Sequence, residues 1–156
     1  MNQENITKIE GYQRVDGRNA YQSTVKKMTL GTPTLAENQS MQIAAQIWKE
    51  NTEGELEVSM ELPIHQIMDL MIFVSRTLLH FREAYRLPLM YDPEKPTLER
   101  IGIQGDVLQV DICTENPNLP ANIQAFAEAV NDLGELTGER LRVLARILAE
   151  MEYCSA

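Results

Sequence analysis

The stretch ELEVSMELP, residues 55–63, alternates apolar and polar side chains and decides the fold class. Its apolar side consists of Leu56, Val58, Met60 and Leu62. Such alternation is typical of a strand with one buried face. Residues 41–49 fit either a helix or a strand by periodicity. Because a glycine-containing turn at 51–54 joins them to the alternating strand, we predict a hairpin.

The remaining segments complete an α+β fold with an antiparallel sheet and helices packed on one face. Pro63 can open a helix, since its missing N–H is not needed in the first turn. The predicted elements are hairpins at about 41–62 and 98–114, a long central helix at about 64–86, and C-terminal helices at about 120–133 and 138–152. We expect a single domain over residues 1–156, with a loose N-terminal segment at 1–11.

Charge and cysteine content limit the classes of partner and compartment. The 156 residues carry a net charge of −9, from 23 acidic and 14 basic side chains. A negative field disfavours nucleic acids and anionic membranes, and it suits a basic protein partner. The N-terminus does not resemble a secretory signal. Cys113 and Cys154 are expected to be reduced thiols of a cytoplasmic protein, with Cys113 buried on a strand.

The predicted central helix carries a narrow polar seam along an otherwise apolar, mostly buried surface. The seam consists of His65, Asp69, Arg76, His80 and Glu83, which fall within an arc of about 60° at about 100° per residue. One interpretation is a solvated edge with local ion pairs. The other is a ligand-binding site, in which Arg76 would anchor an anion. A histidine and an aspartate at such spacing provide only two ligands, which is too few for a metal, and no third is evident elsewhere. Neither metal nor cofactor is therefore predicted.

No catalytic residue is predicted, because the sequence contains no known nucleophile, phosphate-binding or zinc-protease motif. An acidic row along one strand is the candidate partner surface: Glu55, Glu57 and Glu61. Such a row could meet a basic protein, or it could solvate the sheet and block edge pairing. A homodimer built on the exposed faces of the last two helices is a further expectation.

The segments ELPIH (61–65), EAYR (83–86), YDP (91–93) and GERLR (138–142) resemble an uncharacterised bacterial family of single-domain proteins. The likeness extends from Asp16 to Met151. It implies bacterial, cytoplasmic origin and no particular activity. The acidity, the small size and the lack of a catalytic motif lead us to predict a non-catalytic binding or regulatory protein that acts through a protein interface, of which an immunity-like or inhibitor-like role is one form. The alternative is a small-molecule-binding protein or enzyme that uses the polar seam.

Overall fold

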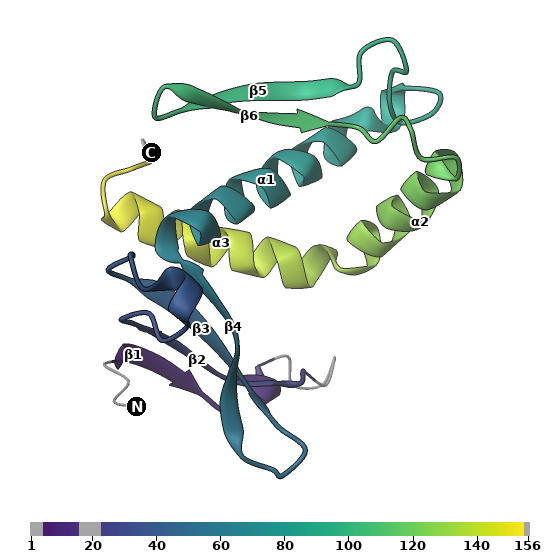
Figure 1. The fold of residues 1–156 in the computed structure, drawn as a ribbon. Helices are drawn as coiled ribbons and strands as arrows, with labels where there is room; N and C mark the ends of the chain where they lie inside the picture. The colour runs from purple at the N-terminus through teal and green to yellow at the C-terminus, as the bar shows by residue number, and fades with distance from the viewer. Residues whose placement is uncertain (1–4, 16–22, 155–156) are drawn as a thin grey trace. The chain divides into compact units, whose positions relative to one another are not determined.

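The computed structural model describes residues 5–15 and 23–154, and its elements confirm the α+β class (Figure 1). Within these ranges, no helix combines the length and the apolarity that a membrane span requires. The chain divides into two compact units, Met1–Ile72 and Phe73–Ala156. The single domain expected over residues 1–156 stays a prediction.

The first unit is built on a four-stranded antiparallel sheet in the order β1-β2-β3-β4. Its elements are β1 (Asn5–Glu10), η1 (Tyr12–Arg14), β2 (Val25–Gly31), η3 (Ala36–Asn38), β3 (Ala44–Glu50) and β4 (Leu56–Pro63). Strands β3 and β4 form the first expected hairpin. Residues 5–10 pair with β2, so the expectation of a loose segment over 1–11 is wrong for them. Residues 1–4 lie outside the described ranges.

A bulge in β4 decides which side chains share a face of this sheet. Ser59 is an extra residue in the ladder, because Met60 and Val58 pair with consecutive residues of β3. An extra residue shifts the alternation of side chains beyond it. As a result, Val58 and Glu61 lie on the same face, although strict alternation would place them on opposite faces.

The two faces of the sheet therefore differ from the predicted arrangement. One face carries the buried polar row Thr29, Gln46 and Glu61. The other carries Ile9, Met28, Ile47 and Met60, each paired with the next, and Leu30 beside them. We call these five residues the apolar sheet face. The sequence predicts buried apolar residues and outward glutamates, but residues 34–38 lie against the polar row and bond to it.

The second unit contains the later part of α1, a hairpin and two C-terminal helices. Its elements are α1 (Ile64–Glu83, which begins in the first unit), η4 (Ala84–Arg86), β5 (Thr97–Ile103), β6 (Asp106–Asp111), α2 (Leu119–Asp132) and α3 (Gly134–Glu150). Strands β5 and β6 form a separate two-stranded sheet, so the two expected hairpins belong to two sheets. Their turn, Gln104-Gly105, has φ angles of 53° and 80°, as a type I′ turn requires.

Packing in the second unit depends on a small set of apolar residues. Those that are buried are Ala84, Val110, Leu119 and Ile123. The ring of Phe81 on α1 lies 5.1 Å from that of Phe126 on α2. The expectation of a mostly buried α1 is wrong, because none of its residues is buried and Met68 and Phe73 are largely exposed. The helix divides between the two units, so each unit includes only part of it.

Candidate functional site

The most extensive hydrogen-bonded cluster among the described residues is the polar row of the first unit. The Thr29 hydroxyl donates to Gln46 Oε1 at 2.7 Å, and Gln46 Nε2 donates to Glu61 Oε2 at 2.9 Å. Thr29 Oγ1 also accepts from the indole Nε1 of Trp48 at 2.8 Å. The Lys27 ammonium lies 4.9 Å from the centroid of the Trp48 ring. A continuous chain of bonds therefore runs from the indole to the carboxylate, and each bond polarises the next.

The Glu61 carboxylate accepts hydrogen bonds from several donors at once. They are Thr34 N–H at 2.8 Å, Thr34 Oγ1 at 3.0 Å, Leu35 N–H at 2.9 Å, Asn38 Nδ2 at 3.1 Å and Gln46 Nε2 at 2.9 Å. Burial opposes the charge, but the bonds from Thr34, Gln46, Leu35 and Asn38 together outweigh it and lower the pKa of Glu61 from 4.5 to about 2. A carboxylate with so low a pKa is a poor general base at neutral pH.

Glu61 therefore anchors residues 34–38 to the sheet and is not part of an outward acidic row. It is 4% exposed, which corrects its place on the expected partner surface. Glu61 is buried because the bulge at Ser59 shifts the register and puts Glu61 opposite Gln46. Glu55 and Glu57 are exposed, as expected. They belong to a group of exposed carboxylates around the β3–β4 turn, which we call the acidic hairpin tip: Glu50, Glu53, Glu55 and Glu57.

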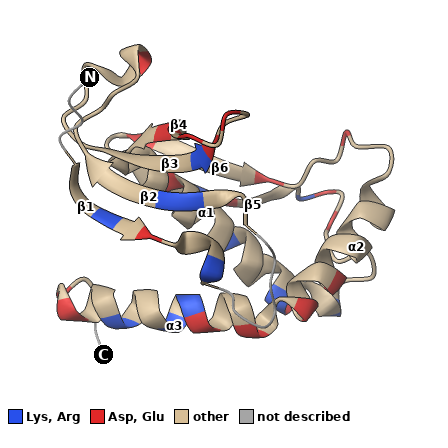
Figure 2. Cartoon of the chain, turned by 90° about the horizontal axis from the view of Figure 1, so that it is seen from below, with Lys and Arg blue, Asp and Glu red and all other residues tan. Residues whose placement is uncertain are grey.

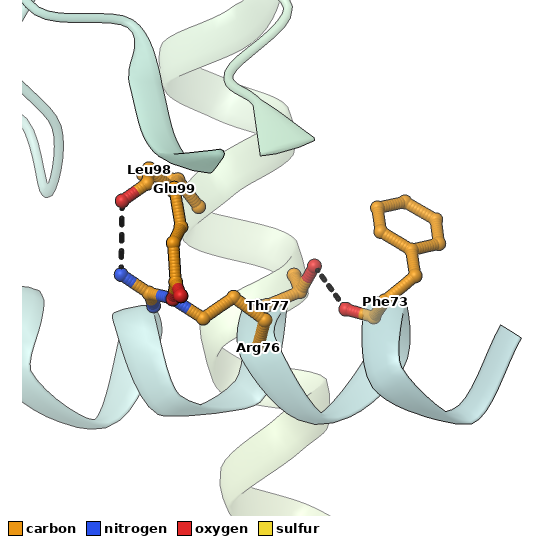
Figure 3. A network of polar contacts seen from close by, with 5 residues as sticks. All are labelled: Phe73, Arg76, Thr77, Leu98 and Glu99. Carbon is orange, nitrogen blue, oxygen red and sulfur yellow. Dashed lines mark hydrogen bonds and ion pairs between the residues drawn. The ribbon is translucent and has the colours of Figure 1, made fainter. Parts of the chain in front are cut away.

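Arg76 of the polar seam connects α1 to β5 inside the second unit (Figure 3). Its Nε donates to Glu99 Oε1 at 2.6 Å, and its Nη2 donates to the Leu98 carbonyl at 3.1 Å. The Arg76 side chain is 22% exposed. The sequence suggests Arg76 as an anchor for an anion. In the structure an anion would have to compete with the Glu99 carboxylate.

The other seam residues do not form the expected local ion pairs. Within the described part of the chain, no hydrogen bond or ion pair joins His65 to Asp69 or His80 to Glu83. Instead, His80 Nε2 lies 3.0 Å from the Met90 carbonyl oxygen. His65 and Glu83 are exposed, whereas Asp69 and His80 are half-buried. The seam is thus made of separate local contacts, and its ligand-binding role stays a prediction.

Neither a metal-binding cluster nor a buried thiol is found among the described residues. No group of three or more His, Cys, Asp or Glu side chains within them could hold a metal ion. Cys113 and Cys154 are both free and exposed. The expectation of a buried Cys113 is wrong, because strand β6 ends at Asp111 and the thiol lies beyond it.

Sequence reasoning missed two features of the first unit. One is the polar row, whose members lie on three different strands and meet only through their register. The only available signal was Gln46, a polar residue opposite the apolar side of its segment. The other is an open pocket that Lys26 and Lys49 line together. Its signal was the concentration of four of the chain's lysines on β1, β2 and β3, which Figure 2 shows in blue.

Comparisons with curated proteins and with solved structures found no significant match. A family model does match, and it covers residues 1–153. This agrees with the resemblance of the sequence to an uncharacterised family. Because the match extends over nearly the whole chain, the protein belongs to the family described as "Family of unknown function (DUF6530)".

Proposed function

We propose that the protein is a non-catalytic binding or regulatory protein, and that the apolar sheet face contacts a basic protein partner. The carrying observation is that three of its five apolar side chains are exposed. Ile9 is 52% exposed, Leu30 is 39% exposed and Met60 is 51% exposed. Exposed apolar residues that form a continuous patch are characteristic of protein interaction sites.

The register of the sheet makes these residues one surface. Ile9, Met28, Ile47 and Met60 form a row that crosses all four strands, because each is the direct partner of the next. Paired residues in an antiparallel sheet have Cβ atoms about 5 Å apart. The row therefore offers contiguous apolar contact area. Its two methionines can adapt their shape to a partner.

Charge at the end of the sheet indicates the chemistry of the partner. The acidic hairpin tip has four carboxylates, and Lys49 is the neighbouring cation on β3. The remaining negative charge would attract a basic surface and repel an acidic one. The expected acidic partner surface is thus retained by Glu55 and Glu57, without Glu61. An immunity-like or inhibitor-like role against a basic protein is the concrete form of this proposal.

The same proposal places the protein in the cytoplasm of a bacterium. The resemblance of the sequence supports the bacterial origin. The two free cysteines support a reducing compartment, where exposed thiols persist.

Capture of a partner by matched variants tests the proposal. Met60→Gln makes the apolar sheet face polar, and Leu56→Gln is the control, since Leu56 is exposed on the same strand but faces the other way. Extract of the protein's own host is passed over each immobilised variant, and bound protein is identified by cross-linking mass spectrometry. We expect Met60→Gln to reduce capture about tenfold and Leu56→Gln to leave it unchanged.

Charge reversal provides the second part of the test. Glu55→Lys combined with Glu57→Lys should weaken capture, and added salt should do the same to the unmodified protein. Equal capture by the Met60→Gln variant would refute the apolar contact. Sedimentation equilibrium tests whether a second copy of the protein occupies this face. A dimer of the unmodified protein that Met60→Gln dissociates would assign the face to a second copy and reject the basic partner.

A further inference from the structure

A concave site lies at the end of the sheet where β2 begins and β3 ends. It has a volume of about 770 Å³, and its lining includes Ser23, Thr24, Lys26, Lys49, Glu50 and Asn51. A volume of this size lies within the range of small-molecule pockets. A second hollow of about 230 Å³ adjoins it and shares Gln13, Lys26 and Glu50. Both hollows are formed by residues of the first unit.

A bulge in β2 places Lys26 at this pocket. Val25 pairs with Lys49, and Lys27 pairs with Trp48, so Lys26 is the extra residue between them. Bulges commonly redirect one side chain away from the regular alternation. The neighbouring Lys27 lies over the Trp48 ring, whereas Lys26 lines the pocket together with Lys49 from the adjacent strand. The bulge thus brings Lys26 to the main pocket, and both lysines line the adjoining hollow.

The donors of the pocket outnumber its negative groups. Neither Lys26 nor Lys49 forms a hydrogen bond or ion pair with another residue of the described ranges. Asn51 uses its Oδ1 to accept from the backbone N–H groups of Glu53 and Glu55, which leaves its Nδ2 as a donor. Ser23 and Thr24 add two hydroxyl groups. Glu50 is the opposing carboxylate in the lining, so among the described lining residues two cations face one anion.

We propose that this pocket binds a small organic anion through a carboxylate or phosphate group. The two ammonium groups and the adjacent hydroxyl and amide donors can bond to several oxygens of such a group. The net charge of −9 repels anions from most of the molecule, which makes a locally cationic concave site distinctive. This inference does not depend on the apolar sheet face, although the pocket shares Glu50 with the acidic hairpin tip.

Nuclear magnetic resonance titration tests the proposal with two probes, citrate and pyrophosphate, at constant ionic strength. Saturable shifts are expected at the amides of Ser23, Thr24, Lys26 and Asn51. Tighter binding of citrate would identify a carboxylate site, and tighter binding of pyrophosphate a phosphate site; equal binding would support the shared anion chemistry. Absence of saturation, or the same shifts with sodium chloride, would overturn the proposal.

Three variants test whether anion binding depends on the pocket residues or only on surface charge in general. Lys26→Gln should weaken binding about tenfold, since it removes one charge-assisted donor. Glu50→Gln should strengthen binding several-fold, because it removes the opposing carboxylate. Lys8→Gln is the control for the loss of a positive charge: Lys8 is exposed on β1, pairs with Glu10 and lies outside this pocket. A similar loss of affinity in the Lys8→Gln and Lys26→Gln variants would refute the site.

Discussion

Replacing Glu61 with glutamine isolates the contribution of the buried carboxylate, because the two side chains have nearly the same size. Every group that bonds to Glu61 is a donor. Both carboxylate oxygens receive such bonds. Glutamine offers one acceptor oxygen and one NH₂ group, so its NH₂ must face donors whichever way the amide is turned. The variant therefore loses a charge and also leaves donors without an acceptor.

The expected loss of stability follows from the pKa of Glu61, which is about 2 in the folded protein against its ordinary value of 4.5. This difference corresponds to about 3 kcal/mol of folding free energy at neutral pH. Unsatisfied donors add about 1–3 kcal/mol. Because the folded pKa is the lower one, the charge stabilises the protein above about pH 4.5, and this stabilisation is lost as the pH falls toward 2. We expect Glu61→Gln to cost about 3–5 kcal/mol at pH 7.

Urea unfolding measured by tryptophan fluorescence is the appropriate assay. Trp48 is the only tryptophan of the chain and belongs to the same hydrogen-bonded row. Glu57→Gln is the matched control, since it removes an exposed carboxylate from the same strand and should cost less than about 0.5 kcal/mol. The difference in the free energy of unfolding between the unmodified protein and Glu61→Gln should shrink by about 2 kcal/mol between pH 7 and pH 3. A gap below about 1 kcal/mol at pH 7, or one independent of pH, would refute the reasoning.

Further predictions concern the turn of β5–β6, the link between α1 and β5, and the indole of the polar row. Gln104→Asn should raise the midpoint of thermal unfolding of the second unit, because asparagine tolerates the positive φ of a type I′ turn better; an unchanged or lower midpoint would contradict the turn assignment. Arg76→Gln should cost about 1 kcal/mol by urea unfolding, since the contact with Glu99 is partly solvated, and Glu99→Gln should cost no more. Trp48→Phe removes the donor to Thr29 and should cost about 1–2 kcal/mol in thermal unfolding followed by circular dichroism; an unaltered midpoint would indicate that this bond contributes nothing.

Local patterns in the sequence were sufficient to place most of the elements. The alternation in residues 55–63 identified β4, and the glycine-containing turn before it identified the hairpin. Pro63 marked the junction of β4 and α1 within one residue, because a proline fits the first turn of a helix. These signals are local, since each depends on neighbours within a few residues.

The face of each strand residue could not be predicted in the same way. Strict alternation assigns Glu61 to the outer face together with Glu57, but the bulge at Ser59 intervenes between them. The partners of Glu61 come from residues 34–46, so its burial depends on contacts distant in sequence. The polar seam illustrates the same limit: its residues lie on one helix, α1, but the partner of Arg76 is Glu99 on β5.

The polar row and the apolar sheet face support one interpretation of the first unit. Thr29, Gln46 and Glu61 connect three strands through side-chain bonds and hold residues 34–38 against the sheet. These bonds stabilise the arrangement of the strands without burial of Ile9 or Met60 on the opposite face. A sheet that is stabilised from its polar side can keep its apolar side accessible. Glu61, which the sequence assigns to a partner surface, thus supports the proposed interface indirectly, because it holds the strands that carry the apolar residues.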